Sequence, residues 1–167
     1  PVVPDVEPVS IDDLLLFTPD DERYDELRMR FNKRTLKRPA GIVLCRDVEE
    51  IRTAVRLARQ EGLAISVKSG GHSFEGFSSN DGGLVIDLSL MKKITWLDDE
   101  LVAIDPACTL AEVNDALLPR GRLLPAGSCA GVGIGGLTLG GGYGLFSRQF
   151  GLTCDHLEGV AMVDGAG

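Results

Sequence analysis

The amino-acid sequence predicts an α+β fold. A strand–helix–strand pattern covers residues 42–67, and a part richer in strands, with one inserted helix, follows it. With 167 residues, the chain is long enough to bury a hydrophobic core in one domain or slightly more. Because the regular alternation of strands and helices stops after the first unit, a doubly wound sheet is not expected.

The N-terminal residues 1–38 are interpreted as a lead-in with short elements. Residues 10–16 predict a short helical turn. Residues 20–32 carry apolar side chains at spacings of three and four, which predicts an amphipathic helix. That helix is expected to stop before Pro39, since the residue before a proline disfavours helical geometry.

The strand–helix–strand unit has clear boundaries. Residues 42–45 and 63–67 are short apolar runs that predict strands. Between them, Asp47 and Glu50 have the spacing of a capping box, and Gly62 is placed to end the helix. We expect the two strands to form a parallel pair with a right-handed crossover.

The remaining elements are shorter. Thr109 and Glu112 form a second capping-box pattern, which predicts a helix through Leu117 that ends at Pro119. Four further strands are expected, over residues 84–88, 92–97, 101–105 and 160–163.

Composition and charge exclude several classes of protein. The net charge of −8 argues against a nucleic-acid surface, and the basic run of residues 33–38 is interpreted as a solvated face. No apolar run approaches the roughly 20 residues that span a membrane. Residues 1–4 lack the features of a signal peptide, and the absence of an initiator methionine leads us to expect a fragment of a longer protein.

The four cysteines, Cys45, Cys108, Cys129 and Cys154, are widely spaced. They include no CxxC pair, and the chain has only two histidines, so a zinc site is not expected. Cys45 and Cys108 lie in apolar surroundings typical of core residues. A disulfide framework remains an alternative.

Residues 127–144 are half glycine, set among small apolar residues. Each glycine inside a regular element costs roughly 0.5–1 kcal/mol relative to alanine, so no ordinary helix or strand is expected here. Flexible linkers are polar, whereas Val132, Ile134, Leu137 and Leu139 are apolar. The composition therefore favours a cradle in which the backbone approaches a large ligand, with a linker as the alternative.

A second glycine-rich turn, residues 68–76, contains His72. Both turns could present backbone N–H groups to phosphate oxygens, although neither is a Walker loop. Gly131, Gly133 and Gly136 match the bare dinucleotide fingerprint but follow no clear strand. His72 alone could be a loop histidine that bonds its neighbours, and Cys129 alone could be a small buried hydrophobic residue. A catalytic Cys–His pair is a further alternative, but it leaves the flanking glycines unexplained.

Six motifs in register resemble the N-terminal FAD-binding part of the berberine-bridge-enzyme-like oxidases, members of the vanillyl-alcohol-oxidase superfamily with a PCMH-type FAD-binding domain. The resemblance covers nearly everything from about Arg38 onward. The motifs span residues 69–76, 85–89, 125–129, 132–136, 140–144 and 148–155.

The resemblance implies FAD as cofactor, held by two covalent bonds. His72 matches the histidine that bonds the flavin 8α carbon, and Cys129 matches the cysteine that bonds C6. Val132 matches a position where valine is associated with oxygen access, which favours an oxidase. The other implied cofactor-binding residues are Ser69, Gly70, Gly71, Ser73, Gly127, Gly133, Gly135, Gly136, Leu139, Gly140, Gly141, Gly142, Gly144 and Val160.

Three positions depart from the family pattern. Lys68 replaces a common arginine, Leu137 a frequent histidine, and His156 a frequent asparagine. None of these is a tether position. His156 itself is interpreted as a surface or structural residue.

The resemblance implies an FAD-binding domain over residues 39–167, with subdomains 39–90 and 91–167 and FAD between them. The expected activity is oxidation of an alcohol, sugar or secondary-metabolite substrate, with O₂ reduced to H₂O₂. The remainder of the polypeptide would supply the substrate domain and the catalytic base, which no residue of this chain matches. A dehydrogenase, a singly tethered enzyme, a non-catalytic FAD-binding fragment and a module for other nucleotides remain alternatives.

Overall fold

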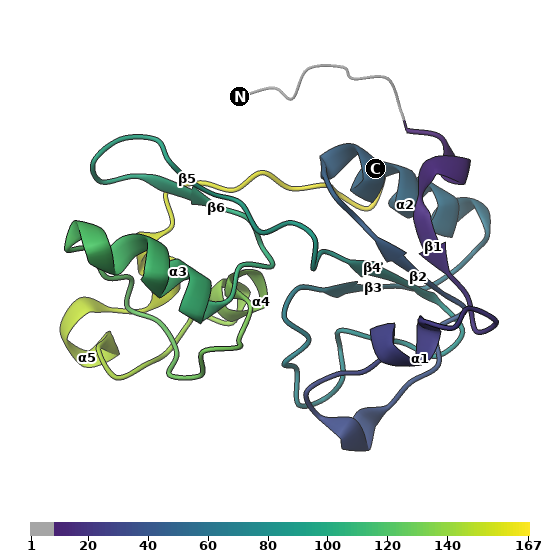
Figure 1. Cartoon of the computed structure of the whole chain (residues 1–167), viewed down its shortest axis with the longest axis horizontal. Helices are drawn as coiled ribbons and strands as arrows, with labels where there is room; N and C mark the ends of the chain where they lie inside the picture. Colours follow the sequence, from purple (N-terminus) through teal and green to yellow (C-terminus); the bar gives the residue numbers. More distant parts are fainter. Residues whose placement is uncertain (1–8) are drawn as a thin grey trace. The chain divides into compact units, whose positions relative to one another are not determined.

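The computed structural model describes residues 9–167, and the interpretation of residues 1–4 lies outside them. The chain divides into two compact units (Figure 1). Unit 1 consists of the described residues up to Lys68, Ser73–Asp87 and Met162–Gly167. Unit 2 consists of Ser69–His72 and Leu88–Ala161. Helices occur with one mixed and one antiparallel sheet, so the predicted α+β class is confirmed.

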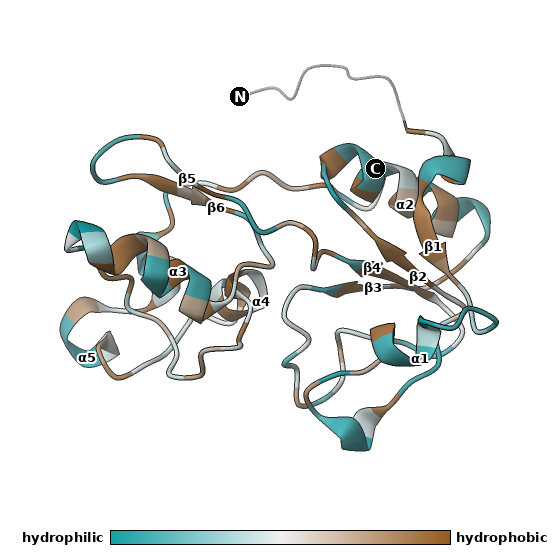
Figure 2. Ribbon diagram, in the orientation of Figure 1, coloured by the Kyte–Doolittle hydropathy of each residue, from teal (hydrophilic) through white to brown (hydrophobic). Residues whose placement is uncertain are grey.

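Unit 1 contains a four-stranded sheet in the order β1-β2-β4-β3. These strands are β1 (Leu15–Phe17), β2 (Gly41–Leu44), β3 (Ile65–Lys68) and β4 (Leu84–Asp87). β1 is antiparallel to β2, whereas β2 and β3 are both parallel to β4. Every residue of β2 and β4 is buried, and the residues of both strands are apolar apart from Asp87 at the end of β4 (Figure 2).

The expected pairing of the first two parallel strands is wrong in one respect. β2 and β3 do not pair with each other, because β4 lies between them and bonds to both. β4 is the more apolar of the two candidate neighbours, with all four residues buried, whereas two of the four residues of β3 are exposed. The apolar run therefore takes the central position, and β3 takes the edge.

Helix α2 (Val48–Gln60) forms as predicted. Asp47 caps it by accepting a hydrogen bond from the Glu50 N–H at 3.0 Å. The reciprocal half of the capping box is absent, because the Glu50 carboxylate instead accepts from the Arg46 N–H at 2.7 Å. Gly62 follows the helix with φ of 65°, a left-handed conformation that favours glycine at a helix end.

The predicted helix over residues 20–32 is wrong in extent, since only α1 (Tyr24–Leu27) forms. The buried Tyr24 hydroxyl donates to the Pro39 carbonyl at 2.6 Å. The buried Arg30 guanidinium then turns back to the carbonyls of Leu27 and Met29, both at 2.8 Å. A side chain therefore occupies the carbonyls that a longer helix would have used for its own N–H groups. Within the predicted turn at residues 10–16, the 3₁₀ helix η1 (Ile11–Asp13) precedes β1.

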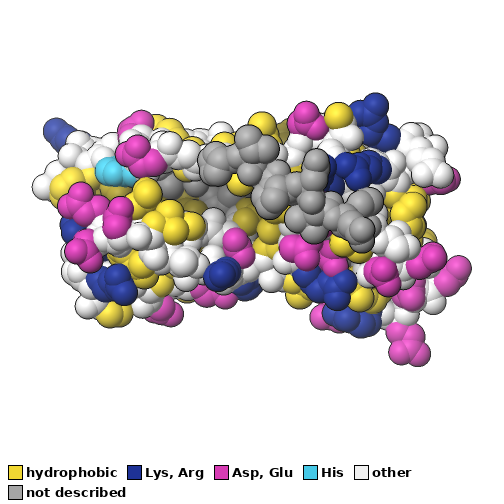
Figure 3. All heavy atoms as spheres, turned by 90° about the horizontal axis from the view of Figure 1, so that it is seen from above, with side chains coloured by type: hydrophobic (Ala, Val, Ile, Leu, Met, Phe, Trp, Pro, Cys, Tyr) yellow, Lys and Arg dark blue, Asp and Glu magenta, His cyan; other side chains and the backbone are white. Residues whose placement is uncertain are grey.

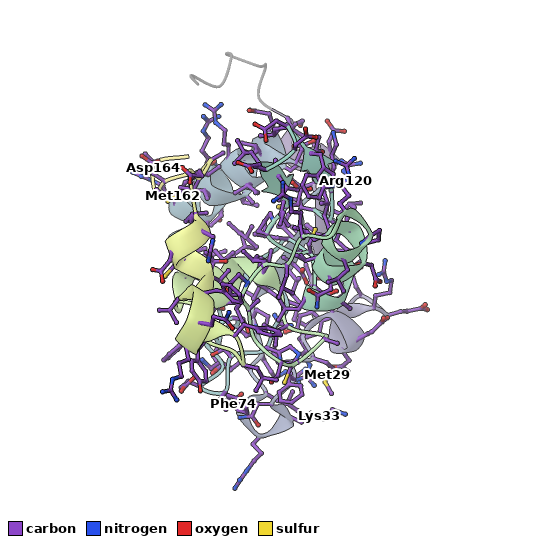
Figure 4. The ribbon with its side chains drawn as sticks, turned by 90° about the vertical axis from the view of Figure 1, so that its left-hand side faces the viewer. Met29, Lys33, Phe74, Arg120, Met162 and Asp164 are labelled. Atoms are coloured by element: carbon purple, nitrogen blue, oxygen red, sulfur yellow. The ribbon has the colours of Figure 1, made fainter. Side chains whose placement is uncertain are left out.

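The lead-in packs against residues 73–87, the part of unit 1 that follows His72 in the chain. The Asn32 amide donates to the Phe74 carbonyl at 2.6 Å, and the rings of Phe31 and Phe74 meet edge to face. Figure 4 labels Phe74 near Met29 and Lys33 of this segment. Around this contact lies the 3₁₀ helix η2 (Lys33–Thr35), within the predicted basic run. Lys37 of that run is not simply solvated, because it donates to two carbonyls of residues 76–79.

Unit 2 has shorter regular elements. Strands β5 (Ile94–Trp96) and β6 (Val102–Ile104) form an antiparallel pair, and helix α3 (Leu110–Leu117) follows with its predicted capping box complete. The 3₁₀ helices η3 (Leu118–Arg120) and η4 (Thr153–His156) and the helices α4 (Ile134–Leu139) and α5 (Ser147–Phe150) complete the unit. The buried residues of its core cluster are Cys108, Leu110, Val113, Leu117 and Ile134.

The predicted strand at residues 160–163 is wrong, because no regular element forms there. Val160 and Met162 are exposed. After this segment, the carbonyls of Gly165 and Gly167 accept hydrogen bonds from arginines of α2, including Arg59 at 2.6 Å and Arg56 at 2.7 Å. These carbonyls therefore accept hydrogen bonds from arginine side chains, and not from the N–H groups of a neighbouring strand.

The surface and helix lengths bear on two further expectations. Within residues 9–167, no helix combines the length and apolar character that crossing a bilayer requires. On the face shown in Figure 3, acidic and basic side chains are interspersed and form no continuous basic patch among the described residues.

Candidate functional site

Residues 69–72 of unit 2, the histidine turn, leave backbone donors available. Gly71 is buried with φ of 67°, a conformation that a glycine adopts without strain. In the described part of the chain, the N–H groups of Gly70 and Gly71 donate no hydrogen bond. Successive free N–H groups around a left-handed residue form a concave site for anions such as phosphate oxygens.

Residues 129–134, the Cys129 segment, are held by the first turn of α3. The Ala111 N–H donates to the Ala130 carbonyl at 3.0 Å, and the Leu110 N–H donates to the Val132 carbonyl at 3.0 Å. A tight turn, in which Val132 donates to the Cys129 carbonyl at 3.2 Å, presents the cysteine. Cys129 is exposed and is a free thiol.

Within unit 2, the structure brings His72 beside the segment that carries Cys129. A Cβ built on Gly131 would lie 3.5 Å from Nε2 of His72, and nothing else comes within 4 Å of it. Gly131 lies two residues after Cys129 in the chain. The half-buried imidazole therefore lies beside the segment that carries the exposed thiol, although 57 positions separate His72 from Cys129 in sequence.

Some of the glycines approach protein atoms and not a ligand. A Cβ on Gly133 would lie 2.5 Å from the Gly70 nitrogen and would overlap the Ser69 hydroxyl. A Cβ on Gly144 would overlap the Ala126 carbonyl oxygen. Gly135 and Gly142 are similarly blocked, by Pro106 and Thr153. At these four positions, contacts with protein atoms are already enough to require glycine. Their role in binding a cofactor stays a prediction.

The expectation that no helix forms in residues 127–144 is also wrong, because α4 lies there. Gly135 is part of this helix, and its N–H donates to the Pro106 carbonyl at 2.9 Å. The close approach of Pro106 excludes any side chain at that position. The helix is short, and it gains from tertiary contact what it lacks in intrinsic propensity.

Other glycines stay open, together with apolar side chains. Nothing lies within 4 Å of a Cβ on Gly136, and a Cβ on Gly140 would meet only carbonyl oxygens of the preceding turn at 3.6 Å or more. Leu139, Tyr143 and Leu145 are each at least four-fifths exposed. Open backbone, exposed apolar side chains and free N–H donors fit a ligand that has both a flat apolar ring and phosphates. FAD has both, so the residues present fit this cofactor.

The remaining predicted site residues occupy different surroundings. Val132 is half-buried and packs against the core cluster of unit 2. Gly127 is half-buried beside Leu137, whereas Val160 is 71% exposed. Ser73 belongs to unit 1, and its hydroxyl accepts from the Phe77 N–H at 3.1 Å. Gly141 has φ of 97°.

The cysteines differ in their surroundings. Burial raises the pKa of the Cys45 thiol to about 12, with nearby carboxylates, Glu50 first among them, adding to the effect. Burial also raises the pKa of Cys108. Both are core residues, as predicted, and all four cysteines are free thiols. A buried thiol of high pKa is a poor nucleophile, so Cys129 is the more accessible thiol for covalent chemistry.

Two residues that sequence reasoning did not single out organise the site. The Pro106 carbonyl accepts from the Ser69 hydroxyl at 2.6 Å as well as from Gly135. The buried Thr153 hydroxyl lies within hydrogen-bonding distance of the Pro125 carbonyl at 2.7 Å and the Gly142 carbonyl at 3.1 Å. Thr153 lies in the family motif of residues 148–155, whereas Pro106 carries no sequence signal beyond its place between a predicted strand and a helix cap. Within residues 9–167, no cluster of three metal-ligating side chains occurs.

Comparison with known families identifies this arrangement. Residues 39–167 match the family model described as the FAD binding domain. The chain belongs to this family. A Bacillus subtilis relative, the uncharacterised FAD-linked oxidoreductase YgaK, is 43% identical over 149 residues, which cover 89% of this chain and 33% of the relative. The chain thus spans about a third of the length of the curated relatives it matches first.

Solved structures agree with this FAD binding domain. The chain is similar to 6-hydroxy-D-nicotine oxidase of Arthrobacter nicotinovorans, with a TM-score of 0.82 and 34% identity, over 90% of this chain and 33% of that one. Glucooligosaccharide oxidase of Acremonium strictum is described as carrying a 6-S-cysteinyl, 8α-N1-histidyl FAD. It matches with a TM-score of 0.80 and 36% identity, over 86% of this chain and 31% of that one. The resemblance to berberine-bridge-enzyme-like, PCMH-type oxidases is confirmed.

Proposed function

We propose that this chain is the FAD-binding part of a longer flavoprotein oxidase in which His72 and Cys129 both bond covalently to the flavin. The observation that carries the proposal is the position of the His72 imidazole beside Gly131, two residues from the exposed Cys129 thiol. A ring held by one residue at each of two positions needs those residues to be neighbours in space.

The His72 tether would exchange an imidazole N–H and a C–H of the flavin 8α methyl group for one C–N bond, and the Cys129 tether would exchange the thiol S–H and the C6–H for one C–S bond. Each exchange would release two electrons and two protons, which one O₂ would take up to give H₂O₂. Two tethers hold the ring against loss and withdraw electron density from it, which raises its reduction potential. A higher potential suits substrates that give up hydride reluctantly, such as alcohols.

The chain's own residues would serve FAD in different ways. The free N–H groups of Gly70 and Gly71 would bind phosphate oxygens, and the exposed Leu139 and Tyr143 would cover apolar ring surface. FAD would supply the hydride-accepting chemistry, and the protein would supply its position and electronics. We place the substrate-binding residues and the catalytic base in the remainder of the polypeptide, because none of the described residues matches the catalytic base of the family.

We assign an alcohol, sugar or secondary-metabolite substrate and O₂ as the partners. The similar proteins are named as oxidases of 6-hydroxy-D-nicotine and of glucooligosaccharides, which are an alkaloid and a sugar. That range supports a small organic substrate. Which substrate it is would depend on the substrate-binding residues, which we place in the remainder of the polypeptide. Val132 supports the oxidase assignment over a dehydrogenase, by its match to the valine associated with oxygen access.

Intact-mass measurement after denaturation tests the tethers in the full-length polypeptide. We expect wild type, His72→Ala and Cys129→Ala to retain the flavin mass, and the double variant to lose it. Release of all flavin from wild type would contradict two tethers. Stopped-flow reoxidation by O₂ tests the oxidase assignment, and slow reoxidation that Val132→Ile leaves unchanged would favour a dehydrogenase.

A further inference from the structure

The carbonyl oxygen of Pro106 joins three segments of unit 2. It accepts from the Ser69 hydroxyl at 2.6 Å and from the Gly135 N–H at 2.9 Å. A carbonyl oxygen has two lone pairs, so it can accept both bonds. Through this atom, the histidine turn and the glycine segment that follows Cys129 share one anchor.

The Cys129 segment does not depend on that anchor alone. Its residues 130 and 132 accept backbone hydrogen bonds from the first turn of α3, and the Ile134 N–H donates to the Cys108 carbonyl at 2.8 Å. These bonds are all made by backbone atoms. A side-chain substitution at Ser69 therefore leaves them in place.

The histidine turn is attached differently. Gly70 lies in close backbone contact with Gly133, and the Ser69 hydroxyl supplies a directional bond from a side chain to Pro106. His72 follows Ser69 by three residues. The contact between Gly70 and Gly133 only keeps the two backbones from coming closer. The hydrogen bond of 2.6 Å also fixes the orientation of the turn, because its strength depends on angle.

We infer that Ser69 is a positioning residue, whose hydroxyl sets the place of His72 beside the Cys129 segment. It acts on the His72 tether and leaves the Cys129 tether to the backbone bonds of α3. This inference rests on the proposed function, in which His72 and Cys129 both bond to the flavin by the balanced exchange given above, with O₂ as oxidant.

The test introduces Ser69→Ala into two backgrounds of the full-length polypeptide. In Cys129→Ala, where His72 is the remaining tether, we expect the ratio of flavin-bearing to bare chains, by intact mass, to fall about fivefold. In His72→Ala, where Cys129 is the remaining tether, we expect that ratio to stay the same. Ser10→Ala is the matched control, because it removes a serine hydroxyl that accepts from the Asp12 N–H in unit 1, and it should change neither ratio.

An equal fall in both backgrounds would assign Ser69 a general structural role and overturn the inference, as would no change in either. If wild type carries no covalent flavin, the proposed function fails, and NMR of the His72 ring then decides the role of Ser69. Ser69→Ala should shift the imidazole resonances of His72, because the turn that carries it loses its bond to Pro106, and should leave the amide resonances of residues 130–132 unchanged. Unchanged His72 resonances would overturn the positioning role by themselves.

Discussion

The two units are stabilised in different ways. In unit 1, two central strands bury every residue, and apolar side chains fill the space around them. In unit 2, both strands are only partly buried, the core cluster has five buried residues, and glycines bring backbone directly against backbone. Side-chain cores relax around small changes of volume, whereas a backbone contact has no rotamer with which to adjust.

The two units also differ in which side chains remain exposed for contact with a ligand. The glycine segment of unit 2 holds its shape without using Leu139, Tyr143 or Leu145, which stay exposed. A segment that is held through its backbone can keep its side chains for a ligand. The buried thiols Cys45 in unit 1 and Cys108 in unit 2 offer a way to follow each unit separately by alkylation.

The largest effect is expected for Gly144→Ala. The new Cβ would overlap the Ala126 carbonyl oxygen, and neither backbone can move without breaking the turn, so we expect a loss of more than about 3 kcal/mol in the free energy of unfolding of unit 2. Pulsed alkylation should label Cys108 well before Cys45. Gly136→Ala is the matched control, since nothing lies within 4 Å of its new Cβ. Equal behaviour of the two variants would refute the distinction between packed and open glycines.

An intermediate effect is expected in unit 1 for Lys68→Met. Lys68 Nζ lies 2.7 Å from the carboxylate of Asp87, which is fully buried. Loss of that cation should lower the free energy of unfolding by about 2–3 kcal/mol, the lower part of the range for broken buried pairs because the Arg30 guanidinium also attracts Asp87. Denaturant titration measures the loss, and Lys68→Arg should keep most of the stability. Here Cys45 should be labelled before Cys108, and the reverse order would count against separate units.

The smallest effect is expected for Glu112→Gln, at the cap of α3. Hydrogen bonds from Lys92 and Thr109 lower the pKa of Glu112 from its ordinary 4.5 to about 2. A lowered pKa in the folded state stabilises the fold above the unfolded pKa, and this contribution is lost as the pH falls through the folded pKa. At neutral pH, the variant should lose about 0.5 kcal/mol, since the carboxylate is partly exposed.

The free energies of unfolding of wild type and Glu112→Gln should converge between about pH 5 and about pH 2. Chemical denaturation at several pH values measures this difference. A difference that stays constant over the range would show that ionised Glu112 does not contribute through its hydrogen bonds.

Sequence reasoning was most successful where a local pattern was sufficient. The cap at Thr109, the helix ending before Gly62 and the buried run of β4 were each predicted close to their observed bounds. It was least successful where a distant residue decided the outcome. The predicted helix at residues 20–32 is short because the Arg30 guanidinium, which also donates to the distant Ser78 carbonyl at 3.2 Å, turns back to the carbonyl of Leu27. Likewise β4, and not β3, pairs with β2.

Residue type and spacing were enough to predict the class of fold and to reveal the family motifs, and the resemblance carried by those motifs made His72 and Cys129 candidate tethers. The folded chain was needed to show that His72 lies beside Gly131, and that Gly133, Gly135, Gly142 and Gly144 are required by protein contacts. Local composition cannot distinguish a glycine that makes room for a ligand from one that makes room for another part of the chain. Their physical difference lies in which atoms occupy the place of the missing Cβ, and that depends on residues far away in the sequence.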